Sequence, residues 1–125
     1  MWAKVSPFTF EYVEDYNSVD VQISFQYREH GDGNPFDGVG GILAHAFSPP
    51  DGRLHYDSDE LWVDGVVNGA FDMQTVGLHE LGHVLGLAHL NGPGSIMYPY
   101  VSSGTRAVLT EDDVDEIRSL YGGVP

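Results

Sequence analysis

The residues His79-Glu80-Leu81-Gly82-His83-Val84-Leu85-Gly86-Leu87-Ala88-His89 carry more information than any other part of this sequence. They read H-E-x-x-H-x-x-G-x-x-H, which predicts a catalytic zinc site on a helix. His79 and His83 lie one helical turn apart, so their rings project from one face and can bind the same ion. Gly86 can adopt the backbone angles that end a helix, which lets His89 turn back as the third ligand. Three protein ligands leave a position open for water, and Glu80 is placed to take a proton from that water.

A methionine follows the third histidine after a turn rich in Gly and Pro, within Gly94-Ser95-Ile96-Met97-Tyr98-Pro99. The long zinc motif followed by such a Met-turn is the metzincin signature. We expect the Met97 thioether to form an apolar floor under the zinc histidines. Without the helix before it, the same methionine would be interpreted as ordinary core packing.

Four further segments appear in unbroken order in the first half of the chain: Arg28-Glu29-His30-Gly31-Asp32, Pro35-Phe36-Asp37-Gly38-Val39-Gly40-Gly41, Leu43-Ala44-His45-Ala46-Phe47 and His55-Tyr56-Asp57-Ser58-Asp59-Glu60-Leu61-Trp62. Together with the zinc motif and the Met-turn, they resemble the catalytic domain of the matrix metalloproteinases (matrixins), most closely the plant-type branch. The resemblance extends from about Trp2 to Gly122. It implies an α/β (α+β) metzincin fold with a twisted mixed sheet, an active-site helix and a C-terminal helix.

The resemblance implies a second, structural zinc site with four ligands: His30, Asp32, His45 and His55. Three imidazoles and one carboxylate can close a tetrahedral site that has no open position for chemistry. All six histidines of the chain are then used by two zinc ions. The alternative is that these side chains are only solvated in a loop rich in Gly and Asp.

The resemblance also implies at least one calcium ion beside the structural zinc. Its ligands would be the side chains of Asp37, Asp57 and Glu60 and the backbone carbonyls of Gly38, Gly40 and Ile42. Oxygen ligands from two segments suit a hard cation; otherwise these segments are solvated acidic turns. A further family calcium needs an aspartate where this chain has Arg53, so we expect no ion between Asp20 and Arg53, whose charges could pair instead.

The composition is that of one acidic domain, and we assign residues 1–125 to a single catalytic domain. A formal net charge of −14 argues against nucleic acid and anionic lipid as partners. The chain has no cysteine, so it has no disulfide framework, and the propeptide cysteine that caps the zinc in the family is missing. We see neither a signal peptide nor an apolar run of membrane-spanning length; secretion to the extracellular space is implied by the resemblance alone.

Apolar and polar residues alternate in two segments, which predicts strands at 8–13 and 19–27, and shorter apolar runs predict strands at 41–47 and 60–63. The structural metal loop is expected at about 28–64, the active-site helix at about 71–86, the Met-turn at about 94–99 and the C-terminal helix at about 110–121. The family's N-terminal strand and most of its first helix have no counterpart before Trp2. We therefore expect apolar side chains to be exposed on one face of the sheet, in a fragment of a longer product or beneath another subunit.

These patterns together predict a zinc-dependent endopeptidase in which Glu80 moves a proton from water to the departing amine. An extended peptide should pair with the edge strand at 41–46, with a hydrophobic residue after the cut bond. The predicted substrate-binding residues are Leu43, Ala44, Val76, Tyr98, Pro99 and Tyr100. Two alternatives are a silent, metal-stabilised domain that binds peptides without cleaving them, against which the intact Glu80 argues, and a partial product that folds only with an N-terminal segment.

Overall fold

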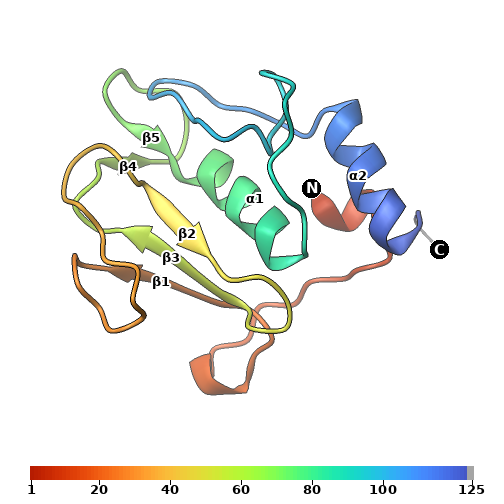
Figure 1. Cartoon of the computed structure of the whole chain (residues 1–125), viewed down its shortest axis with the longest axis horizontal. Coiled ribbons are helices and arrows are strands. Elements are labelled where there is room, and N and C mark those ends of the chain that lie inside the picture. Colours follow the sequence, from red (N-terminus) through yellow and green to blue (C-terminus); the bar gives the residue numbers. More distant parts are fainter. Residues whose placement is uncertain (124–125) are drawn as a thin grey trace.

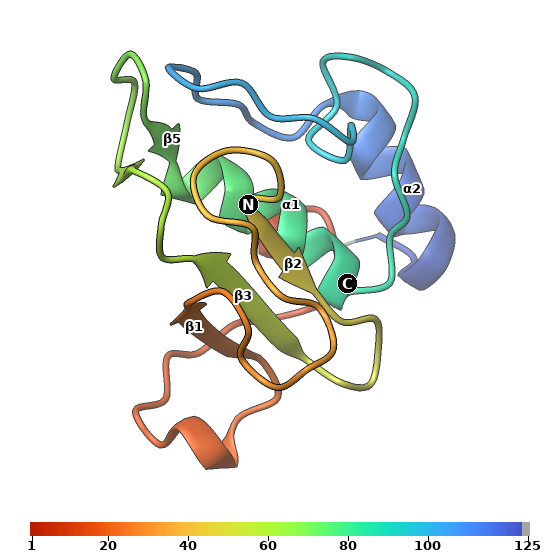
Figure 2. The ribbon, with the colours of Figure 1, turned by 60° about the vertical axis from the view of Figure 1, so that its left-hand side comes forward.

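Residues 1–123 are described by a computed structural model of the chain, shown in Figure 1. The strands are β1 (Gln22–Gln26), β2 (Ala44–Ala46), β3 (Arg53–Asp57), β4 (Trp62–Val63) and β5 (Phe71–Asp72). The helices are α1 (Met73–Val84) and α2 (Glu111–Tyr121), with short 3-10 helices at Trp2–Lys4 and Tyr16–Ser18. In both views α1 lies between the three-stranded sheet and α2 (Figures 1 and 2). None of the helices in residues 1–123 is long and apolar enough to cross a membrane.

The main sheet is mixed, with the strand order β1-β3-β2. β1 runs parallel to β3, and β2 runs antiparallel to it. A second, two-stranded parallel pair is formed by β4 and β5. β2 is therefore an edge strand of the main sheet, and its free edge lies on the side of α1 (Figure 2).

Helix α1 is buried on two sides, and apolar residues of its sequence face each of them. Toward the sheet, Val76 and Val84 pack with Leu54 of β3. Toward α2, Leu78 packs in a second core that includes Ile117. The N-terminal Trp2 closes this second core: it is 1% exposed and its indole N–H donates to the Leu78 carbonyl at 2.9 Å.

The exposure of apolar side chains expected on one face of the sheet is present on β1. Ile23 and Phe25 are 55% and 48% exposed, although they are in register with the buried Leu54 and Tyr56 of β3. The polar residues of β1 are the less exposed ones. The strand thus extends its apolar face beyond the region that α1 covers.

All four predicted strands need correction. Residues 8–13 form no strand; most of them are exposed and none pairs with a strand, so their alternating pattern finds no partner. The predicted strands at 19–27, 41–47 and 60–63 are shortened to Gln22–Gln26, Ala44–Ala46 and Trp62–Val63. The central strand β3 was missed, because its Arg, His and Asp residues hide the apolar alternation of Leu54 and Tyr56.

The helix predictions agree with the structure apart from their ends. Helix α1 begins at Met73, since residues 71–72 form β5, and Asp72 caps it by accepting from the Thr75 N–H. Helix α2 begins after Thr110, which forms a capping box with Asp113.

Candidate metal centres and active-site cleft

His79, His83 and His89 converge at the C-terminal end of α1, with ligand nitrogens all within 4.8 Å of one another. The Nδ1 of His79 donates to the Ile96 carbonyl at 2.6 Å, and that of His83 to the Leu87 carbonyl at 2.8 Å. A carbonyl only accepts, so the Nε2 of each neutral ring carries a lone pair. These two Nε2 atoms are 3.1 Å apart. Lone pairs that face each other at this distance fit a shared cation.

The turn after α1 brings His89 back toward the other two histidines, as the sequence predicts. Gly86 has φ +100°, a conformation that side chains with a Cβ rarely adopt. Its N–H donates to the His83 carbonyl, and the Leu87 N–H donates to the Gly82 carbonyl, each at 2.9 Å. These two bonds form a Schellman motif, which ends the helix and reverses the chain.

The Met-turn packs directly under α1. Met97 is fully buried, and a Cβ added to Gly82 would lie 2.4 Å from its sulfur. Only glycine at this position allows the turn to approach the helix one residue before His83. The Met-turn therefore supports the ligand-bearing face of α1 from below.

Asp113 holds the Met-turn in place, a role that the sequence analysis missed. This carboxylate of α2 is fully buried and accepts from the backbone N–H groups of Ile96 and Met97 at 2.8 and 3.1 Å. The same Ile96 offers its carbonyl to His79. In the sequence, Asp113 is one of three acidic residues in the first turn of a helix, and nothing in that pattern marks the one that is buried.

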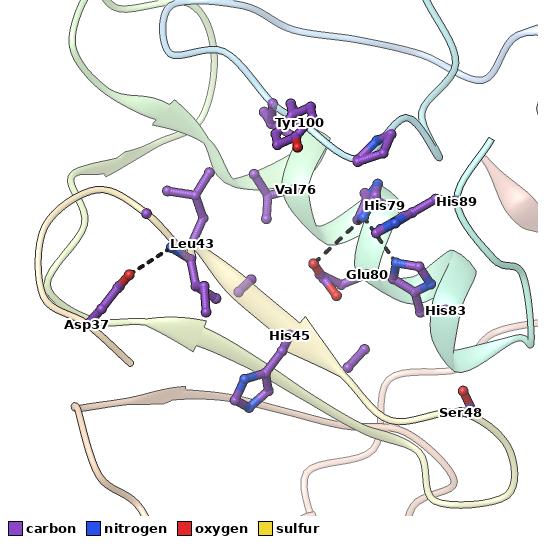
Figure 3. A pocket seen from close by; sticks show the side chains of 16 residues that line it. Asp37, Leu43, His45, Ser48, Val76, His79, Glu80, His83, His89 and Tyr100 are labelled. Atoms are coloured by element: carbon purple, nitrogen blue, oxygen red, sulfur yellow. Dashed lines mark hydrogen bonds and ion pairs between the residues drawn. The ribbon is translucent and has the colours of Figure 1, made fainter. Parts of the chain in front are cut away.

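Glu80 lies beside the histidines and points into the cleft (Figure 3). Its nearest carboxylate oxygen is 4.0 Å from the His79 Nε2. Burial raises the pKa of Glu80 to about 7, while burial lowers the pKa of His79 to about 4. At neutral pH the imidazole is thus free to bind a metal, and the carboxyl group can accept or release a proton.

A cleft of about 680 Å³ runs between β2 and α1. Five of the predicted substrate-binding residues line it, namely Leu43, Ala44, Val76, Pro99 and Tyr100. The sixth, Tyr98, is outside the lining, and Val101, which was not predicted, is part of it. Figure 3 shows Leu43, Val76 and Tyr100 at one end of the cleft and the three histidines at the other.

The second cluster brings together His30, Asp32, His45 and His55. One Asp32 oxygen lies 2.9 Å from His30, 3.0 Å from His45 and 3.1 Å from His55. In a tetrahedral site each ligand atom lies about 2.0–2.1 Å from the zinc ion, so two ligand atoms are about 3.3 Å apart. The distances from Asp32 to the three histidines are close to this value. The His30 Nδ1 donates to the Arg28 carbonyl at 2.7 Å, so the lone pair of its Nε2 faces the carboxylate. This donor set fits a zinc ion with four protein ligands.

The predicted calcium site is only partly assembled by side chains. Asp57 is fully buried, and its Oδ2 is a buried side-chain atom without a hydrogen-bond partner in residues 1–123. Burial and the charges of Asp59 and Asp37 raise the pKa of Asp57, and burial also raises that of Glu60. An unpartnered oxygen among carboxylates fits a hard cation. In the described residues, however, only the two histidine clusters have all their ligand atoms within 4.8 Å.

Arg53 does not pair with Asp20, contrary to the suggestion from the sequence. Its guanidinium donates to both carboxylate oxygens of Asp51, at 2.7 and 2.9 Å, and stacks 4.0 Å over the Phe47 ring. Asp51 is only two residues away in the same turn, so this contact requires little ordering of the chain.

Nearly the whole chain is similar in sequence to known proteins. The profile of the Matrixin peptidase family matches residues 1–122. Metalloendoproteinase 2-MMP of Arabidopsis thaliana is 47% identical over 99% of the chain and 35% of that protein. Metalloendoproteinase 1 of Glycine max is 46% identical over 97% of the chain and 42% of that protein. Stromelysin-1 of Rattus norvegicus is 44% identical over 98% of the chain and 26% of that protein.

The chain spans 35–42% of the length of these two plant relatives. Five plant metalloendoproteinases are 45–47% identical to it, compared with 40–45% for three animal relatives. This order agrees with the resemblance to the plant-type branch. With the zinc motif in this geometry and nearly half of its residues shared with known metalloendoproteinases, the chain belongs to the matrixin family.

Proposed function

We propose that the chain acts as the catalytic domain of a zinc-dependent endopeptidase. The observation that carries this proposal is the pair of Nε2 lone pairs on His79 and His83, 3.1 Å apart, with Glu80 beside them in an open cleft. A zinc ion held there would supply a Lewis acid that polarises the carbonyl of the bond to be cut and acidifies water. A closed structural site would need no cleft and no neighbouring base.

Glu80 is the proposed general base. With a pKa near neutrality, its carboxylate can accept the proton of the attacking water and then give it to the departing amine. The hydrogen bonds from His79 and His83 to backbone carbonyls fix their tautomers, so the nitrogens facing the cleft stay unprotonated.

The proposed substrate is a protein segment in extended conformation. β2 bonds to β3 on one side only, so its other edge can pair with a peptide chain. A hydrophobic side chain after the cut bond would enter the end of the cleft lined by Leu43, Val76 and Val101. Matrixins are typically secreted, and we propose that this chain acts outside the cell.

The second histidine cluster is proposed to hold a structural zinc, and the carboxylates around Asp57 at least one calcium. Both would order residues 28–64, a region whose strands β2, β3 and β4 are short. Asp37, Asp57 and Glu60 supply the carboxylates; the carbonyl ligands Gly38, Gly40 and Ile42 remain predictions from the resemblance.

Replacing Glu80 with Gln tests the activity. The amide keeps the shape but cannot accept a proton, so peptide hydrolysis should fall by at least roughly 10²-fold while zinc content is unchanged. Glu111→Gln is a matched control, because Glu111 is exposed on α2. Near-native hydrolysis by the Glu80 variant would rule out its role as base. A wild-type protein that binds zinc and peptide but cleaves nothing would favour the silent binding domain.

A further inference from the structure

One side of the cleft is formed by residues 98–105, which we call the wall segment. It has no regular secondary structure, and its residues Pro99, Tyr100 and Val101 line the cleft. Figure 1 shows it passing over α1 toward β5 and returning toward α2. One of its few backbone hydrogen bonds to another part of the chain runs from the Gly104 N–H to the Ala70 carbonyl at 2.9 Å. Its position relative to α1 therefore depends on how its ends are attached.

The first end of the wall segment follows directly from the buried Met97 and is fixed by Asp113. The second end is held by Arg106. The guanidinium of Arg106 donates through Nε and Nη2 to the two oxygens of Asp72, at 2.9 and 3.0 Å. A bidentate pair of this kind fixes orientation as well as distance.

Asp72 is fully buried and already caps the first turn of α1. It accepts from the Thr75 N–H at 3.2 Å and from the Thr75 hydroxyl at 2.6 Å. The next residue of the second end, Ala107, donates its N–H to the same Thr75 hydroxyl at 3.0 Å. Thr75 directly precedes Val76, which also lines the cleft. Arg106 and its neighbour thus attach the wall segment to the start of the helix that carries Val76.

We propose that Arg106 is a positioning residue that sets the separation between the wall segment and α1, and thereby the size of the side chain that the cleft accepts. This inference rests on the proposed peptidase function. Asp64 contacts the same guanidinium, and its side chain is 86% exposed. If the pair only capped α1, its loss would lower stability without changing which side chains fit.

Two variants and a matched control separate these possibilities. Arg106→Lys keeps the charge but cannot donate bidentately. The double variant Asp72→Asn/Arg106→Met leaves no unpaired buried charge, and asparagine still caps a helix. The control Asp64→Ala removes the exposed contact and leaves the Arg106–Asp72 pair intact. The substrates are two peptides that differ only in the residue after the cut bond, leucine in one and tryptophan in the other.

In both variants we expect the ratio of kcat/KM between the two peptides to change by at least about fivefold, mainly through KM. The control should keep the wild-type ratio. Inhibition by acetohydroxamic acid, which is too small to reach the wall segment, should be unchanged. Hydrogen exchange at the Gly104 amide should be faster in the variants than in the control.

An unchanged peptide ratio in a folded variant would overturn the proposal, and the lysine variant alone decides if the double variant does not fold. If the wild-type protein cleaves neither peptide, the proposed function fails, and the exchange rate at Gly104 still tests the attachment. Exchange as slow in the lysine variant as in the control would then overturn it.

Discussion

The two histidine clusters are assembled in different ways, although both present nitrogen lone pairs to a common centre. The first takes all three ligands from eleven consecutive residues, 79–89, arranged by one helix and the turn that ends it. The second takes ligands from a loop and two strands, spread over residues 30–55. His45 and His55 meet because β2 and β3 pair in that register. The first cluster therefore depends on local helix geometry, and the second on the folding of the whole sheet.

Removing a ligand from the first cluster should have the largest effect on activity and a small effect on the fold. In His83→Ala we expect hydrolysis to fall by at least roughly 10³-fold, since the metal contributes several kcal/mol to lowering the barrier. Metal analysis should find two zinc ions per wild-type chain and one in the variant. A variant that binds one zinc and stays fully active would contradict the assignment of the catalytic role to the first cluster.

Removing a ligand from the second cluster should act chiefly on stability. In His55→Ala we expect the melting temperature to fall by at least about 5 °C, because three chain segments lose their common link. Amides of residues 28–60 should exchange faster, while His79, His83 and His89 still bind zinc. Unchanged melting and exchange would show that this cluster does not hold the sheet together.

Acid should destabilise the metal-free protein over the pH range in which the histidines of the unfolded chain take up protons and those of the folded chain do not. The folded pKa of His79 is about 4, below the unfolded value of about 6.5. Burial lowers the pKa values of His45 and His55 in the same direction. Between these pH values the unfolded chain binds more protons than the folded chain. The free energy of unfolding is therefore highest above about pH 6.5 and falls as the pH drops toward 4. Urea titrations in EDTA at about pH 7 and about pH 5 should show this loss of stability; equal stability at the two pH values would contradict the prediction.

The carboxylates beside the second cluster offer a test in which the sign of the effect depends on calcium. Asp57→Asn removes a buried charge whose pKa is raised by burial. In EGTA the variant should be at least as stable as the wild type, because the penalty of burying that charge is gone. With calcium only the wild type should gain stability. If the melting temperature of the wild type does not change when calcium is added, this result would argue against the ion site.

The smallest expected effect concerns Arg53. The backbone of Asp20 lies against this turn, where Gly52 approaches its carbonyl. Arg53→Asp would place a second carboxylate near Asp20 and should add one calcium to the binding stoichiometry measured by calorimetry. Two calcium ions bound by the wild type would show that the arginine does not exclude this ion.

Sequence reasoning succeeded where a residue's neighbours in the chain decide its environment. The spacing of His79, His83 and His89, the glycine at 86 and the Met-turn all predict local geometry, and the structure contains it. It failed for β3, whose polar residues Arg53, His55 and Asp57 interrupt the apolar pattern, and for residues 8–13, which pair with no strand. The resemblance supplied His30, Asp32, His45 and His55 as a set, which their spacing alone does not predict.

By itself the sequence determined the zinc-binding helix, because a period of 3.6 residues places His79 and His83 on one face whatever surrounds them. Only the tertiary structure decided which other groups support them. Asp113 and Arg106 are ordinary charged residues in the sequence, yet one orders the Met-turn and the other joins residues 98–105 to α1. The physical reason is that burial and long-range contact set the pKa, partner and role of a charged group, and neither is encoded in its immediate neighbours.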